Sequence, residues 1–231
     1  MFRFKQFAIR QHRSALKVGT DAVVFGAWVD YRGAGRILDI GTGTGVLALI
    51  AAQRSPQAAV HAVEIDDASA LEAAENAAAS PWAGRIRVHR MDARRLKADA
   101  PFDLILCNPP YHEGTSPAAS ARGRVARHGA ELSFAELVAV AESLLGPAGR
   151  FAAIVPTGRQ AEFIDLCAAR GLHLARRCML RYVARRPPKR ALLELRRERV
   201  ACVEEELTVE GEGPKSFSPE ARALVADLID R

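Results

Sequence analysis

The sequence predicts an α/β fold in which a mostly parallel sheet is covered by helices on both faces. Between residues 35 and 155, short runs rich in aliphatic residues alternate with stretches of helical periodicity, the pattern of repeated strand-helix units. A glycine-rich turn joins the first of these strands to the helix that follows it. The 231 residues, 49% of them hydrophobic, are enough for one sizeable core. We therefore expect one domain over residues 1–231, with residues 1–34 as an N-terminal extension that contributes to the mouth of the site.

Five strands and four helices follow from this alternation. Asp66 is a candidate N-cap, Ser133 and Glu136 have the spacing of a capping box, and Gly171 is a typical residue to end a helix. The expected strands are 36–40, 60–64, 86–89, 102–107 and 151–155, and the expected helices are 44–54, 66–79, 133–146 and 159–170.

The pattern then changes to two long strand-like runs, residues 172–183 and 190–205, joined by a short connection with a Pro-Pro turn. A connection this short cannot contain a parallel crossover, so we expect an antiparallel hairpin at one edge of the sheet. The sheet would then have seven strands, the last of them reversed. In the tail, Ser218 and Pro219 form an N-cap and a first-turn proline ahead of a helical pattern.

The glycine-rich turn contains Gly41, Gly43 and Gly45 between a strand and a helix. Glycines let backbone N–H groups approach a ligand at the helix N-terminus. A dinucleotide-binding enzyme would have glycine or alanine three residues after Gly43, but Val46 stands there, which disfavours NAD. We expect Asp39, within the preceding strand, to brace this turn at a cofactor site.

Carboxylates end the next two strands. Glu64 lies nineteen residues after Gly45, where a carboxylate can accept hydrogen bonds from both hydroxyls of a ribose. Asp92 follows the third strand, where it can accept from the amino group of an adenine. The alternative for each residue is a helix cap with no ligand contact. Together with the glycine turn, the two carboxylates favour a nucleoside site at the carboxyl edge of the sheet.

The fourth strand is followed by Asn108, Pro109, Pro110 and Tyr111. An exocyclic amine on an aromatic base is a poor nucleophile, because its lone pair is delocalised into the ring. If the Asn108 side-chain oxygen and the Pro109 carbonyl each accept one N–H, the lone pair can point at an electrophile. The prolines stiffen this loop, and Tyr111 offers a ring for base stacking. The segment therefore indicates methylation of a planar amine or amide, a reaction that requires no metal and no histidine base.

At this point the chain resembles a known family. The segments DIGTGTG, VEID, MDA and NPPY are similar to those of class I S-adenosyl-L-methionine-dependent methyltransferases that act on amines, which implies a Rossmann-like sheet of order 3-2-1-4-5-7-6 with strand 7 antiparallel. The flanks resemble the bacterial tRNA1(Val) (adenine(37)-N6)-methyltransferases over residues 2 to about 200. The segments that carry this resemblance are Phe4–Phe7, His12–Arg13, Lys17–Asp21, Phe25–Trp28, Ser80–Ala83 and Ala126–His128.

The resemblance assigns roles to residues around S-adenosyl-L-methionine. Gly41, Gly43 and Gly45 would border its methionine part, Glu64 its ribose, and Asp92 with Ala93 its adenine. Thr20 and Asp21 would line its amino-acid end, although Thr20 is equally suited to cap a helix over residues 21–31. Asn108 would contact both cofactor and substrate.

The net charge of +6 and the pI of about 9.5 make an anionic partner plausible. Basic residues cluster in residues 1–20, in residues 122–127 and in residues 172–190, which suggests phosphate contacts of a tRNA around the catalytic mouth. We expect the acidic residues 204–206 to face away from it. The expected RNA contacts are Arg3, Lys5, Arg13, Arg122, Arg124, Arg127, Arg185, Arg186 and Lys189.

The expected function is N6-methylation of an adenine in tRNA. One alternative is glutamine-N5 methylation of a protein, but the roughly 34 residues before the first strand are too few for the substrate domain of that group. The other is a protein that binds S-adenosyl-L-methionine or RNA without catalysis. The sequence shows no spanning segment and no signal peptide, and its four cysteines include no CxxC pair, so we expect a cytoplasmic protein without a metal site.

Overall fold

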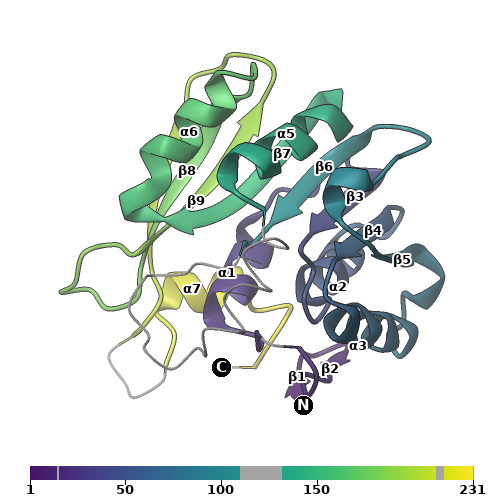
Figure 1. The fold of residues 1–231 in the computed structure, drawn as a ribbon. Helices are drawn as coiled ribbons and strands as arrows, with labels where there is room; N and C mark the ends of the chain where they lie inside the picture. Colours follow the sequence, from purple (N-terminus) through teal and green to yellow (C-terminus); the bar gives the residue numbers. More distant parts are fainter. Residues whose placement is uncertain (15, 110–131, 212–215, 231) are drawn as a thin grey trace, which may run out of the picture.

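The computed structural model describes residues 1–14, 16–109, 132–211 and 216–230, and its centre is a twisted, mostly parallel sheet (Figure 1). In the described part of the chain this sheet has eight strands in the order β10-β8-β9-β7-β6-β3-β4-β5. The neighbours from β5 to β7 pair in parallel, whereas β9 is antiparallel to both β7 and β8. The strands are β3 (Arg36–Ile40), β4 (Ala59–Glu64), β5 (Ile86–Arg90), β6 (Phe102–Cys107), β7 (Leu145–Pro156), β8 (His173–Arg181), β9 (Arg190–Arg196) and β10 (Val203–Thr208).

The order of β3 to β9 confirms the predicted order 3-2-1-4-5-7-6 with its reversed last strand. Helices cover both faces, α1, α2 and α7 on one and α5 and α6 on the other, while α3 packs at the β4–β5 edge (Figure 1). The central strand β6 shows why: Leu104 and Leu106 belong to one core cluster, Ile105 and Cys107 to the other. The helices are α1 (Thr20–Trp28), α2 (Val46–Arg54), α3 (Asp67–Ala78), α5 (Phe134–Leu144), α6 (Gln160–Ala168) and α7 (Pro219–Leu224).

The local signals for helix ends are confirmed. Asp66 caps α3 by accepting from the Ser69 N–H, and Ser133 forms a reciprocal capping box with Glu136 at the start of α5. Ser218 caps α7, which has the expected proline in its first turn. Because each cap is a local interaction, the sequence was sufficient to place these helix starts.

The predicted strand over residues 190–205 is wrong. The run divides into β9, which ends at Arg196, and the edge strand β10, which pairs in parallel with β8. Charge pairing explains the position of β10. Arg176 Nε lies 2.8 Å from Glu205, and Arg177 Nε lies 2.7 Å from Glu204.

Arg181 Nε likewise donates to Glu206 at 2.8 Å. The acidic segment therefore neutralises three arginines of β8 that the sequence counted as part of a basic cluster. These arginines are satisfied within the fold, so the basic patch of residues 172–190 is smaller than its sequence suggests.

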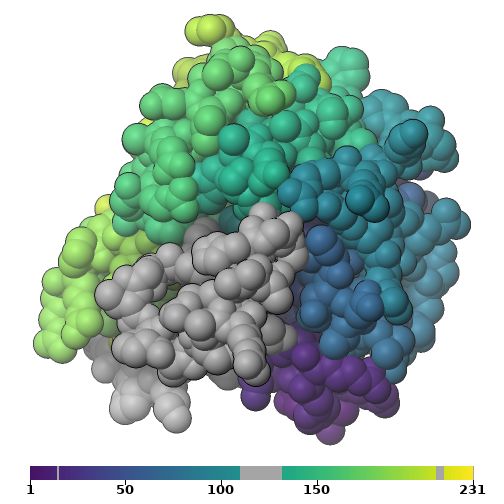
Figure 2. All heavy atoms as spheres, in the orientation of Figure 1, coloured from purple at the N-terminus to yellow at the C-terminus, as the bar shows by residue number. Residues whose placement is uncertain are grey.

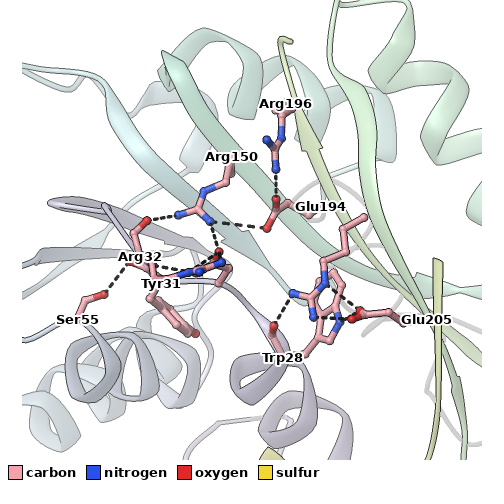
Figure 3. A network of polar contacts seen from close by, with 10 residues as sticks. Trp28, Tyr31, Arg32, Ser55, Arg150, Glu194, Arg196 and Glu205 are labelled. Atoms are coloured by element: carbon pink, nitrogen blue, oxygen red, sulfur yellow. Dashed lines mark hydrogen bonds and ion pairs between the residues drawn. The ribbon is translucent and has the colours of Figure 1, made fainter. Parts of the chain in front are cut away.

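A second charged cluster joins the segment after α1 to β7 and β9 (Figure 3). Glu194, 2% exposed, accepts from Arg196 Nη2 at 3.0 Å and lies 3.9 Å from Arg150 Nη1. Arg150 Nη1 also lies 3.3 Å from Asp30, and its Nη2 donates to the Arg32 carbonyl at 2.7 Å. The cluster therefore ties the segment after α1 to β7 and β9 through paired charges.

The N-terminal segment was expected only as an extension, and the structure gives it a small hairpin, β1 (Phe2–Arg3) with β2 (Ala8–Ile9). The Lys5 N–H donates to the Leu228 carbonyl at 2.8 Å, and Lys5 Nζ donates to the Ala226 carbonyl at 2.7 Å. Residues near the two ends of the described chain are thus bonded to each other.

Candidate active site

The strand register brings the predicted site residues to one edge of the sheet. Ile40 of β3 is level with Val63 of β4 and with Cys107 of β6. Because the three strands are parallel, the residues that follow lie at the same edge of the sheet; they are Gly41, Glu64 and Asn108. The backbone therefore brings the glycine turn, Glu64 and the Asn-Pro segment to the same edge of the sheet, as the sequence predicts.

The glycine turn is built from left-handed residues. Gly41, Gly43 and Gly45 have φ angles of +70°, +56° and +85°. Residues with a Cβ rarely adopt such positive φ angles. A Cβ added at Gly41 or Gly43 would meet no described atom within 4 Å, whereas one at Gly45 would lie 3.4 Å from Ala73 of α3. Within the described part of the chain, the first two glycines therefore border space that a ligand can fill, and the third permits close helix packing.

Glu64 braces the same turn. Its Oε2 accepts from the Gly43 N–H at 2.9 Å, and its Oε1 accepts from the Asp66 N–H at 2.9 Å. Each carboxylate oxygen keeps a second acceptor site. The half-buried side chain can therefore hold the turn and still accept hydrogen bonds from ribose hydroxyls.

Asp92 has the geometry of a cap. It accepts from the Arg94 N–H at 2.9 Å at the start of a short 3-10 helix, and Arg94 forms a two-pronged contact with its carboxylate at 2.9 and 2.7 Å. Hydrogen bonding from the Arg94 side chain lowers the pKa of Asp92. The adjacent Ala93 is buried. In this structure Asp92 therefore acts as a helix cap, which was the alternative to ligand contact. Any ligand would share its carboxylate with Arg94.

Asp39 lies entirely inside the fold, under the glycine turn. Its Oδ2 accepts from Thr42 Oγ1 at 2.5 Å and from the Ala48 N–H at 3.2 Å, while its Oδ1 has no partner among the described residues. Burial raises the pKa of Asp39 to about 7, against the opposing hydrogen bonds from Thr42 and Ala48. The expected brace is present, and it holds a carboxyl group that titrates near neutral pH.

The interpretation of Thr20 as an N-cap is wrong. Gly19 occupies the cap position, and Thr20 is the first residue of α1. Asp21 accepts a hydrogen bond from the Tyr182 hydroxyl and one from Arg190 Nε at 3.2 Å. Burial raises the pKa of Asp21, and the charge of Arg190 opposes this. Tyr182 and Arg190 lie more than 160 positions from Asp21 along the chain, so no local sequence pattern could reveal these two contacts.

Asn108 and Pro109 follow β6 directly. Asn108 is half-buried, Pro109 is buried, and no other described residue hydrogen-bonds to the Asn108 side chain. The amide oxygen is therefore available to a substrate amine. Pro110, Tyr111, Arg122, Arg124 and Arg127 lie outside the described residues.

The basic residues at positions 1–20 and 172–190 differ in whether an acidic residue of the fold pairs with them. Lys5 pairs with Asp230 at 2.9 Å, and Arg13 pairs with Glu75 at 2.7 Å. In these two clusters, the exposed basic side chains without an ion pair to another described residue are Arg3, Arg10, Lys17, Arg185, Arg186 and Lys189. The N-terminal segment (purple) and the connection between β8 and β9 (light green) are both visible on the face drawn in Figure 2.

The described residues hold no group of three or more metal-ligating histidine, cysteine, aspartate or glutamate side chains. None of their helices has the length and apolar character that a membrane crossing needs.

Comparison with known proteins defines the class of this chain. Residues 15–162 match the family model of the methyltransferase small domain. A predicted O-methyltransferase from Agrobacterium tumefaciens has the same fold, with a TM-score of 0.67 and 21% identity over 89% of this chain and 95% of that one. With the glycine turn and sheet order described above, the chain is a class I methyltransferase that uses S-adenosyl-L-methionine.

Curated relatives identify the family within this class of methyltransferases. The tRNA1(Val) (adenine(37)-N6)-methyltransferase of Tolumonas auensis is 44% identical, covering 100% of this chain and 97% of its own. That of Trichodesmium erythraeum is 40% identical, with coverages of 98% and 96%. The chain belongs to this family. The similarity extends through the C-terminal tail, beyond the limit near residue 200 that sequence motifs alone suggested.

Proposed function

We propose that this enzyme transfers the methyl group of S-adenosyl-L-methionine to N6 of an adenine in tRNA, adenine 37 of tRNA1(Val). The observation that carries the proposal is the position of Asn108 and the Pro109 carbonyl at the end of β6, one strand from the glycine turn. The names of the relatives supply the substrate.

Two acceptors explain the chemistry. The Asn108 side-chain oxygen and the Pro109 carbonyl oxygen each accept one N6–H, so that the nitrogen lone pair leaves conjugation with the ring. When bound, S-adenosyl-L-methionine would supply an electrophilic methyl group on its sulfonium. The methyl group would pass from sulfur to N6, with one N6 proton released to solvent afterwards. Pro110 and Tyr111 lie outside the described residues, and the sequence alone gives them their proposed roles, a proline that restricts the backbone and a ring on which the adenine can stack.

Gly41 and Gly43 would border the methionine part of the cofactor, and Glu64 would accept hydrogen bonds from its ribose. Asp92 and Ala93 would hold its adenine, and Thr20 and Asp21 its amino-acid end. Gly45 and Asp39 act by shaping the turn, because Gly45 packs on Ala73 and Asp39 is bonded to Thr42.

The tRNA backbone contacts the exposed Arg185, Arg186 and Lys189, together with Arg3, Lys5 and Arg13, and with Arg122, Arg124 and Arg127 after the catalytic segment. Residues 1–34 form part of the same domain over 1–231 and one wall of the mouth. The reaction takes place in the cytoplasm, where tRNA is modified.

Labelled S-adenosyl-L-methionine tests the proposal. We expect label in the N6-methyladenine of tRNA and none in a release factor protein, which is the substrate of the glutamine-N5 alternative. We expect Asn108→Ala to retain cofactor affinity but to lower kcat at least about a hundredfold, the effect of losing a positioned electrostatic contact. A near-normal kcat in this variant would remove Asn108 from the mechanism. Label in neither substrate, with cofactor bound, would favour the non-catalytic alternative.

A further inference from the structure

The carboxylate of Glu72, in the middle of α3, binds the backbone of the N-terminal segment. Its Oε1 accepts from the His12 N–H at 2.6 Å and the Arg13 N–H at 3.0 Å, and its Oε2 accepts from the Ser14 N–H at 2.8 Å. The side chain is 2% exposed. Glu72 therefore cannot reach a ligand, and its partners are the main chain of a segment about sixty residues earlier.

One turn further along the same face of α3, Asn76 holds two segments at once. Its Oδ1 accepts from the Arg10 N–H at 2.8 Å, and its Nδ2 donates to the Arg10 carbonyl at 2.9 Å. The same Nδ2 donates to the carbonyl of Thr44, in the glycine turn, at 2.9 Å. Asn76 is also 2% exposed. A single amide thus ties residue 10 to the glycine turn.

The glycine turn and α3 pack closely between these two sets of hydrogen bonds. Gly45 lies against Ala73, which stands between Glu72 and Asn76 on the helix. Within the N-terminal segment, the Gln11 side chain accepts from the Val18 N–H at 2.9 Å. A continuous set of bonds therefore runs from the glycine turn through α3 and residues 10–14 to Val18, two residues before Thr20.

The charge of Glu72 is stabilised by these contacts. Burial alone would raise the pKa of its carboxyl, but the N–H groups of Ser14, Arg13 and His12 outweigh that effect and lower the pKa to about 2. With its pKa at about 2 the carboxyl is ionised at neutral pH, so the three hydrogen bonds are charge-assisted.

We propose that Glu72 and Asn76 are positioning residues for cofactor binding: from α3 they hold residues 10–14 against the glycine turn and so place the segment ahead of α1 at the amino-acid end of S-adenosyl-L-methionine. The role given to that segment rests on the cofactor orientation in the proposed function. The cofactor-binding step can be measured without tRNA, so a wrong substrate assignment would not affect the test.

Glu72→Gln removes the charge and keeps the shape of the side chain. We expect the Kd and the KM for S-adenosyl-L-methionine to rise about tenfold, the loss of roughly one charge-assisted hydrogen bond, with kcat at saturating cofactor within about twofold of wild type. Hydrogen exchange at the amides of residues 12–14 should become faster. Glu75→Gln is the matched control. Glu75 lies on the same helix, and among the described residues its side chain bonds only to the solvent-exposed Arg13 side chain. Such a screened pair contributes little, so its variant should change the Kd far less than Glu72→Gln does.

Gln11→Ala tests the link without altering α3, and it covers the case in which Glu72→Gln fails to fold. It removes the bond to Val18 only, and we expect it to raise the Kd for the cofactor severalfold at an unchanged unfolding midpoint. A folded Glu72→Gln with wild-type Kd would overturn the proposal. An unchanged Kd in Gln11→Ala, or an equal loss in Glu75→Gln, would do the same.

Discussion

The buried carboxyl group of Asp39 makes the stability of this protein depend on pH in an unusual direction. Burial raises its pKa to about 7 in the folded state, from a reference value of 3.8. Between these two values the folded protein binds a proton that the unfolded chain has released. The contribution of Asp39 to stability is therefore complete at low pH and is lost as the pH rises to about 7.

The substitution Asp39→Asn removes this titration while preserving the size of the side chain. Its oxygen can still accept from Thr42 and Ala48, and its amide takes the place of the unpartnered Oδ1. With 1.36 kcal/mol for each pKa unit, the free energy of unfolding of the variant relative to wild type should rise by about 3 kcal/mol between pH 5 and pH 8. The same substitution should weaken cofactor binding at pH 8, because a negative charge near a cationic ligand is lost.

Urea unfolding of both proteins without cofactor, at pH 5, 6, 7 and 8, measures this difference. Groups other than Asp39 titrate in both proteins and cancel. Thr42→Val is a useful second variant, because loss of the hydroxyl that stabilises the charged form should raise the pKa of Asp39 and extend the decline in stability to higher pH. If wild type and Asp39→Asn show parallel pH dependence, the carboxyl is not protonated in the folded state and the argument fails.

Two further predictions concern ligand binding. Glu64→Ala should weaken cofactor binding by about 1.5–3 kcal/mol, because charge-assisted hydrogen bonds and the anchor of the Gly43 N–H are lost together; calorimetry that finds unchanged affinity would contradict it. Arg185→Ala with Arg186→Ala should weaken tRNA binding and flatten the dependence of log K on log salt by roughly 0.7–0.9 per arginine, without changing the methylated base. Arg177→Ala is the control for filter binding at several salt concentrations, since Glu204 already neutralises Arg177 and the slope should stay the same. An equal slope in wild type and the double variant would mean that this connection does not contact phosphates.

The sequence was sufficient for the parts of the fold that depend on local chemistry. Alternation of strand and helix patterns gave the α/β class, and the family resemblance implied the sheet order. Asp66 and Ser133 marked helix starts because a cap bonds within three residues. The register of parallel strands then placed Gly41, Glu64 and Asn108 at one edge without further information.

The remainder depended on partners far apart in the chain. Glu72 and Asn76 lie in an alanine-rich helix, where an acid and an amide look like ordinary surface residues, and their partners are backbone groups roughly sixty residues away. Glu205 likewise looks solvated in sequence, but it accepts from Arg176 and from the Trp28 indole N–H. Polar residues with distant partners carry no periodic signal, so pattern analysis overlooks them.

The bonds between Lys5 and residues 226–230 have a consequence for the order of folding. They join positions 221 residues apart, so they close a loop of almost the whole chain, and the entropy of that closure opposes their early formation. The parallel sheet from β3 to β7 is complete by Pro156, long before Leu228 has been synthesised. The hairpin that contains Lys5 therefore gains its bonds to the C-terminal tail late in folding, whereas residues 10–14, which bond to α3, can dock as soon as that helix has formed.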